Sequence, residues 1–193
     1  MKPSIPQPPP RYSERPFPPY RHRPGRTPHP VLDPKGHLFG QEGAADDSFD
    51  TQQWQQSESY LYGVDLFNHG YFWEAHEAWE GIWKSAPTGS LADLFLRGLI
   101  QLAAAMLQRE TGKLAGMRSL SRKGLERLRQ VARQESNFCG LELESWIGGF
   151  SENIEAGQSK KISRKAAKPQ RPEKEKSRFT FLILGLCALC GFA

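Results

Sequence analysis

Apolar side chains recur every three to four residues between positions 51 and 155, which is the spacing of one face of an α-helix. No alternation of apolar and polar residues persists beyond a few positions, so strands are not expected. The pattern predicts an all-α fold, a compact bundle of about five helices with short loops. The expected helices cover residues 58–69, 71–84, 91–110, 113–133 and 141–154.

Local signals support the ends of these helices. Gly70 and Gly112 follow the first and third helices, where a glycine in the left-handed conformation is common. Ser90 suits the N-cap of the third helix, with Asp93 three residues later. This third helix is apolar nearly all round, which indicates a central position in the bundle. A turn at Pro87 should join it to the second helix as an antiparallel hairpin.

The prolines are concentrated in the part of the chain before the helical region. Residues 1–50 hold 12 of the 15 prolines. Because proline fixes φ and lacks an N–H donor, this stretch should form neither a helix nor a central strand. We expect it to be extended, polyproline-like and disordered. The composition thus gives four segments: a Pro-rich disordered arm (1–50), a helical bundle domain (51–155), a basic linker (156–178) and an apolar tail (179–193).

Charge follows the same division. Residues 1–30 carry a net charge of +5 and residues 156–178 carry +7, whereas residues 31–155 carry −7. The net charge of +5 therefore comes from the flanks, and the domain itself is acidic. A nucleic-acid-binding domain would show the opposite distribution. We expect the partner of the domain to be a protein or a small molecule instead of a nucleic acid.

The tail is uncharged, strongly apolar and preceded by basic residues, as a membrane anchor would be. As a helix, its 15 residues would reach about 22 Å, less than the roughly 30 Å of the hydrocarbon core. Two alternatives stay open: a short anchor, or a helix packed on the domain or on a partner. The first 20 residues lack the apolar core of a secretion signal, so we expect a cytoplasmic domain, at the inner membrane face if the tail inserts.

One polar string on the second helix suggests chemistry. Residues 76–80 read His-Glu-Ala-Trp-Glu, an H-E-x-x-E string. His76 and Glu80 are four residues apart and share a face with the aromatic Trp79 and Trp83. Leaving one member of a buried ion pair alone costs on the order of 3–5 kcal/mol, so Glu80 should have a cationic partner.

The third helix offers that partner. Its polar side chains Arg97, Gln101 and Gln108 fall on a single stripe at 100° per residue. In an antiparallel hairpin, Glu80 and Glu77 would reach Arg97, and His76 would reach Gln101. The sequence therefore predicts a buried network of these polar residues: His76, Glu77, Glu80, Arg97 and Gln101.

Three roles for this network stay open. It could fix the register of two helices as part of an interaction or structural module. It could form a small-molecule or catalytic pocket, with His76, Glu77 and Glu80 as candidate acid/base groups. It could hold a metal through His76 and Glu80, although zinc needs at least three protein ligands and an arginine on the stripe disfavours any cation. The sequence leaves undecided whether the domain is an enzyme and what cofactor it would use.

Two further residues are candidates for a role. Asn68 either caps the first helix or points towards the face of His76. Cys139 has no neighbouring base in the sequence, and we expect it to be inert. The three cysteines cannot form a disulfide scaffold, and no phosphate-binding or nucleophile-elbow motif is present.

The strings LFNHGYFWEAHEAWEGIWK (66–84) and LRGLIQLAAAMLQRETGKLAG (96–116) resemble the bacterial and archaeal family called domain of unknown function 309. Its pattern is an F-N-x-G turn, an E-A-H-E-x-x-E-x-x-W helix and a G-L-I-Q-x-A-A helix. The resemblance implies a small all-α fold and implies no activity. The chain departs from the family pattern at Gln108, where many members carry a histidine that would be a second imidazole ligand. The family positions present here are Asn68, His76, Glu77, Glu80, Trp83, Gly98 and Gln101.

Overall fold

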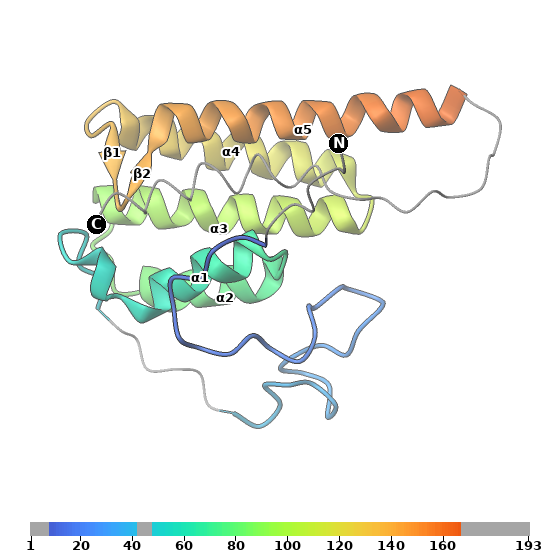
Figure 1. Ribbon diagram of the computed structural model, residues 1–193, viewed down its shortest axis with the longest axis horizontal. Coiled ribbons are helices and arrows are strands. Elements are labelled where there is room, and N and C mark those ends of the chain that lie inside the picture. The colour runs from blue at the N-terminus through green and yellow to red at the C-terminus, as the bar shows by residue number, and fades with distance from the viewer. Residues whose placement is uncertain (1–7, 42–47, 167–193) are drawn as a thin grey trace, which may run out of the picture.

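The structure, a computed structural model, describes residues 8–41 and 48–166, with side chains as far as residue 155. Predictions for the remaining residues, including the apolar tail 179–193, lie outside this part of the chain. Figure 1 shows a helical bundle with one small hairpin. Its elements are η1 (Trp54–Gln56), α1 (Glu58–Asn68), α2 (Phe72–Trp83), α3 (Leu91–Glu110), α4 (Leu114–Ala132), β1 (Asn137–Phe138), β2 (Leu141–Glu142) and α5 (Leu143–Ala166).

The α3 helix is the centre of the fold, as its all-round apolar sequence predicts. It lies between a layer made by α4 and α5 and a layer made by α1 and α2 (Figure 1). By length and composition alone α3 could cross a membrane, but 56% of its most apolar window is buried inside the protein. The aromatic rings of Phe67 on α1 and Phe150 on α5 stack at 6.5 Å, which joins the two layers in one core.

The ends of the helices follow the predicted signals. Ser90 caps α3, where its Oγ accepts a hydrogen bond from the Asp93 N–H at 3.1 Å. Gly70 and Gly112 have φ values of 81° and 77°, a conformation that glycine adopts without steric cost. The turn that begins at Pro87 joins α2 to α3, and these two helices pack against each other. The expected five-helix, all-α fold is therefore confirmed.

Three glycines allow close packing between helices. A Cβ at Gly63 of α1 would lie 2.2 Å from the indole Nε1 of Trp79 on α2. A Cβ at Gly98 of α3 would lie 2.8 Å from Leu128 of α4, and one at Gly124 would lie 2.9 Å from the Gly98 carbonyl oxygen. The absence of these side chains lets α1 approach α2 and lets α3 approach α4.

The last helix differs from its prediction at both ends. It starts at Leu143, because a hairpin over 137–142 precedes it. Two residues per strand are too few for an alternating pattern to be seen in the sequence. At the other end the backbone remains helical to Ala166, so the first part of the predicted basic linker is helix. The residues from 156 to 166 include no proline and several good helix formers.

The prediction of a disordered arm is wrong for residues 8–41, here called the N-terminal segment. This segment has turns but no helix or strand, as its prolines predict, and it packs beside α1 and α2 (blue in Figure 1). Ser13 and His22 are only 7% and 5% exposed. The segment is ordered because several of its non-proline residues donate hydrogen bonds to acceptors on the helices.

Candidate functional site

The H-E-x-x-E residues gather at the surface of α2. His76 Nε2 lies 3.2 Å from Glu80 Oε2, and the two side chains remain 30% and 35% exposed. Potential ligand atoms of His76, Glu77 and Glu80 all lie within 4.8 Å of one another. Partial desolvation raises the pKa of Glu77, helped by the nearby Glu80 carboxylate and opposed by His76. The expectation that these residues are buried is therefore wrong, because this edge of the aromatic face is open to solvent.

Arg97, the predicted partner of Glu80, pairs with a different carboxylate. Arg97 Nε lies 2.8 Å from Asp93 Oδ1, one turn earlier on α3, and its guanidinium stacks 4.9 Å from the Trp83 ring. Among the described residues, Arg97 has no ion pair with Glu80. Arg97 forms its ion pair with a nearer acid on its own helix, so the predicted link between α2 and α3 through Glu80 is wrong.

The rest of the polar stripe faces α4. Gln101 Oε1 accepts a hydrogen bond from Arg127 Nη1 of α4 at 2.8 Å. Gln108 lies against α4, where its Oε1 would be 3.3 Å from a Cβ at Gly116. The predicted contact of Gln101 with His76 is thus replaced by one with Arg127. The 100° spacing put these residues on one stripe but could not tell which neighbour the stripe faces.

Asp93 performs the joining role that was predicted for Arg97. It is 3% exposed and accepts hydrogen bonds from Trp83 Nε1 at 2.6 Å and from the Gly89 N–H at 2.9 Å. Burial opposes its ionisation, but these hydrogen bonds and Arg97 outweigh burial and lower the pKa of Asp93. The register of α2 and α3 is therefore fixed at the turn between them.

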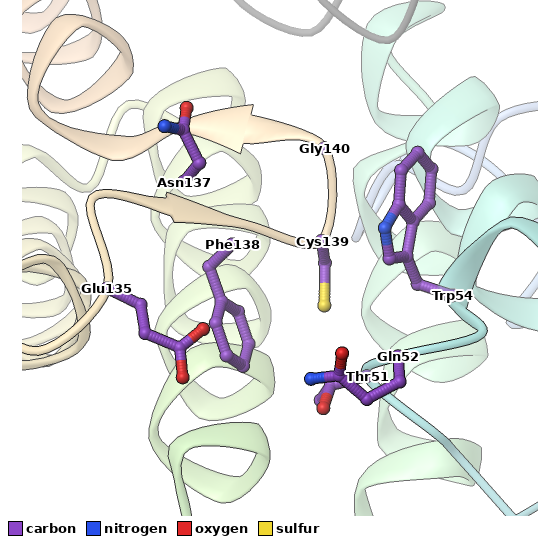
Figure 2. A pocket seen from close by; sticks show the side chains of 8 residues that line it. All are labelled: Thr51, Gln52, Trp54, Glu135, Asn137, Phe138, Cys139 and Gly140. Atoms are coloured by element: carbon purple, nitrogen blue, oxygen red, sulfur yellow. The ribbon is translucent and has the colours of Figure 1, made fainter.

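Figure 2 shows a cavity of about 260 Å³ between η1 and the hairpin. Its walls include Trp54, Glu135 and Cys139, and none of the H-E-x-x-E residues. The Cys139 thiol is 5% exposed, and burial strongly raises its pKa, so it stays protonated. The pKa shift favours the inert role expected for this cysteine.

A more extensive set of polar contacts joins α1 and α2 to the N-terminal segment. The Asp65 carboxylate on α1 is fully buried and accepts four hydrogen bonds. Tyr12 N–H donates to Oδ1 at 2.9 Å. Arg11 Nε, Ser13 N–H and Ser13 Oγ donate to Oδ2 at 3.1, 3.0 and 2.9 Å. Every one of these donors comes from residues 11–13.

Aromatic rings continue this contact along the turn between α1 and α2. The Phe17 ring stacks on Tyr71 with centroids 5.1 Å apart and packs on the His69 ring at 4.7 Å. Arg15 lies over the Tyr62 ring at 4.6 Å, and the Tyr62 hydroxyl donates to the Pro16 carbonyl at 2.9 Å. The segment is thus bound by rings and hydrogen bonds together.

The contact continues on α2. Glu74 Oε1 accepts a hydrogen bond from the His22 N–H at 2.7 Å, and the His22 ring packs on Trp73. Glu74 is 5% exposed, and burial raises its pKa despite that hydrogen bond. Burial also lowers the pKa of His22 and of His69. We call the surface formed by the following residues the α1–α2 face: Tyr62, Asp65, His69, Tyr71 and Glu74.

Sequence reasoning missed this face, although one signal was present. Asp65 is the only Asp, Glu, Lys or Arg between positions 59 and 73, in a stretch that is mostly apolar. Asn68, which was a candidate, is 8% exposed, and its side-chain amide has no hydrogen-bond partner among the described residues. Asn68 therefore does not cap α1.

The fold and these sites define a small all-α domain that carries an exposed His/Glu cluster and holds its own N-terminal segment. Residues 60–120 match the family model of the domain of unknown function DUF309, which confirms the resemblance seen in the sequence. The match includes the α1–α2 face and the H-E-x-x-E residues, and it excludes the N-terminal segment. No curated protein and no solved structure matches the chain.

Proposed function

We propose that this protein is an interaction module, and that the α1–α2 face is its binding surface for an extended polypeptide. The observation that supports this proposal most strongly is the buried Asp65 carboxylate, whose four hydrogen bonds all come from residues 11–13. A buried carboxylate without donors is strongly destabilising. The helices therefore need an added segment, and in this chain the N-terminal segment supplies it.

The test separates a bound segment from an integral part of the core. In the full chain, Asp65→Asn should accelerate amide hydrogen exchange in the N-terminal segment and leave the exchange of α3 unchanged. Glu126→Gln is the matched control, because the Glu126 side chain is 53% exposed and its ion pair is with Arg133, away from the N-terminal segment. Loss of protection throughout α1 and α2 in Asp65→Asn would contradict the proposal, because the segment would then belong to the folding core.

A metal-binding function is the second candidate, favoured by the grouping of His76, Glu77 and Glu80 within 4.8 Å. One imidazole and two carboxylates would give the three protein ligands that a zinc site needs at minimum. Elemental analysis of the purified full chain, beside Glu80→Gln, tests it. Stoichiometric metal that disappears in Glu80→Gln would support this function. No metal, together with an effect of His76→Ala on stability alone, would support the interaction module.

We place this module in the cytoplasm, with the apolar tail 179–193 as its proposed attachment to the inner membrane face. The basic residues before the tail favour this orientation. Fractionation of cells that express the full chain, or the chain without residues 179–193, tests the attachment. Equal distribution of the two forms would contradict it.

A further inference from the structure

The two sides of the contact at Asp65 belong to different parts of the chain. The acceptors lie in the segment matched by the DUF309 model, whereas the donors lie outside it. The charges are also complementary, since residues 31–155 carry −7 and residues 1–30 carry +5. The domain therefore presents a formed acceptor surface to a basic ligand that is a separate stretch of polypeptide.

The ligand is recognised by a short pattern between prolines. Residues 8–10 are three prolines and residue 16 is another, so the N–H donors of this stretch are confined to residues 11–15. Two consecutive donors, from Tyr12 and Ser13, meet the single carboxylate of Asp65. A proline at position 13 would remove both the N–H and the hydroxyl that bind there.

Arg11 shapes this ligand as well as binding through its charge. Its Nε pairs with Asp65, while its Nη2 donates to the carbonyl oxygens of Ser13 and Arg15. Its guanidinium also lies 4.1 Å from the centre of the Phe17 ring. The arginine thus holds the chain in the bend that delivers Phe17 to Tyr71. The recognised unit is Arg-x-Ser followed by an aromatic residue after a proline.

From these contacts we infer that the α1–α2 face recognises Arg-x-Ser segments of other polypeptides, flanked by prolines, and that residues 11–22 occupy the face as an intramolecular competitor. This inference rests on the proposed interaction function and adds the class of partner. Arg11 keeps 34% of its side chain exposed, so the contact is open to solvent at its rim. A tethered segment competes at an effective concentration on the order of millimolar, so a partner binds well only when the tethered segment is weakened.

The experiment uses the full chain and a fluorescein-labelled peptide of residues 8–24. The Arg11→Ala/Ser13→Pro chain has a weakened tethered segment and an intact face. It should bind the wild-type peptide at least about tenfold more tightly than the wild-type chain does, because the competitor is removed. Adding Asp65→Ala to this variant should remove the gain, and a peptide with Arg11→Ala/Ser13→Pro should bind at least about tenfold more weakly, a difference of about 1.4 kcal/mol. Fluorescence anisotropy measures all four affinities.

Hydrogen exchange on the same variants separates the outcomes. If the Arg11→Ala/Ser13→Pro chain releases its segment and still binds the peptide no better than wild type, the inferred partner class is wrong. The inference also fails if this variant does not release its segment, because Arg-x-Ser would then not be the recognised unit. If release unfolds α1 and α2, the proposed interaction function itself fails.

Discussion

Ser13 and Asp65 are joined by two hydrogen bonds to one oxygen atom. The Ser13 N–H and the Ser13 hydroxyl both donate to Asp65 Oδ2, at 3.0 and 2.9 Å. Ser13 is 7% exposed and the Asp65 side chain is fully buried. This pair connects a proline-rich segment to a helix 52 residues away, and it holds that segment against the helix.

A negative charge at position 13 should release the N-terminal segment. Ser13→Asp places a second carboxylate against buried Asp65, whereas Ser13→Ala removes only the hydroxyl and keeps the N–H. A hydrogen bond to a charged group contributes about 1.5–3 kcal/mol, so Ser13→Ala should loosen the segment partly and Ser13→Asp should release it. Amide hydrogen exchange of residues 11–29 measures the difference. Equal exchange in the two variants would show that the carboxylate of Asp65 does not govern the contact.

Acidification should loosen the same segment. Burial lowers the pKa of His22, His37 and His69 from the ordinary value of 6.5. The released state therefore binds more protons than the bound state between the lowered pKa values and 6.5, so the stability of the contact falls as pH drops through this window. His29 acts in the same direction by lowering the pKa of His22, as His22 does for His37.

The carboxyl groups oppose this trend. On α3, Glu110 pairs with Arg23 of the segment, with Oε2 and Nε 3.5 Å apart. The raised pKa values of Glu74 and Glu110 mean that the bound state holds extra protons above the ordinary value of 4.5, which favours binding as pH falls. Hydrogen exchange of residues 11–29 at pH 7.5 and 5.5, corrected for the intrinsic rate, measures the balance. We expect more opening at pH 5.5 and a smaller pH effect in His22→Gln. An unchanged pH effect in that variant would exclude His22 as a main contributor.

Gly63 and Gly81 should respond oppositely to alanine. At Gly63 the new Cβ would lie 2.2 Å from Trp79 Nε1, and overpacking of this kind costs about 1–3 kcal/mol. A Cβ at Gly81 of α2 would meet no other side chain of the described residues within 4 Å, so the better helix propensity of alanine should stabilise the fold by up to about 1 kcal/mol. Urea unfolding followed by circular dichroism compares the two variants. Stabilisation by Gly63→Ala would mean that Trp79 can move aside.

Asp93 should contribute more to stability than the arginine it pairs with. Asp93→Ala leaves the Trp83 and Gly89 N–H groups without their acceptor. Each buried donor left without a hydrogen bond lowers the free energy of unfolding by about 1–3 kcal/mol. Arg97→Met removes a side chain that is 39% exposed, and ion pairs of exposed groups contribute about 0–1 kcal/mol. In thermal unfolding, the Tm of Asp93→Ala should therefore be well below the Tm of Arg97→Met. The reverse order would make the ion pair, and not the turn, the main link between α2 and α3.

The sequence by itself determined the helices and the central place of α3. Their periodic apolar positions and the signals at Gly70, Ser90 and Gly112 are local, and local hydrogen bonding and side-chain burial follow from them directly. The H-E-x-x-E string was also visible, and it does bring His76 and Glu80 together because residues four apart share a helix face.

Only the tertiary structure decided which partners the polar residues take. Periodicity places Arg97 and Gln101 on one stripe of α3. The orientation of α3 in the bundle brings Gln101 to Arg127 of α4, and Arg97 pairs with Asp93 on its own helix. The proline-rich composition correctly excluded helix and strand in residues 8–41. It could not reveal the contact of Ser13 with Asp65, because a hydrogen bond across 52 residues depends on where the folded helices place an unpaired acceptor.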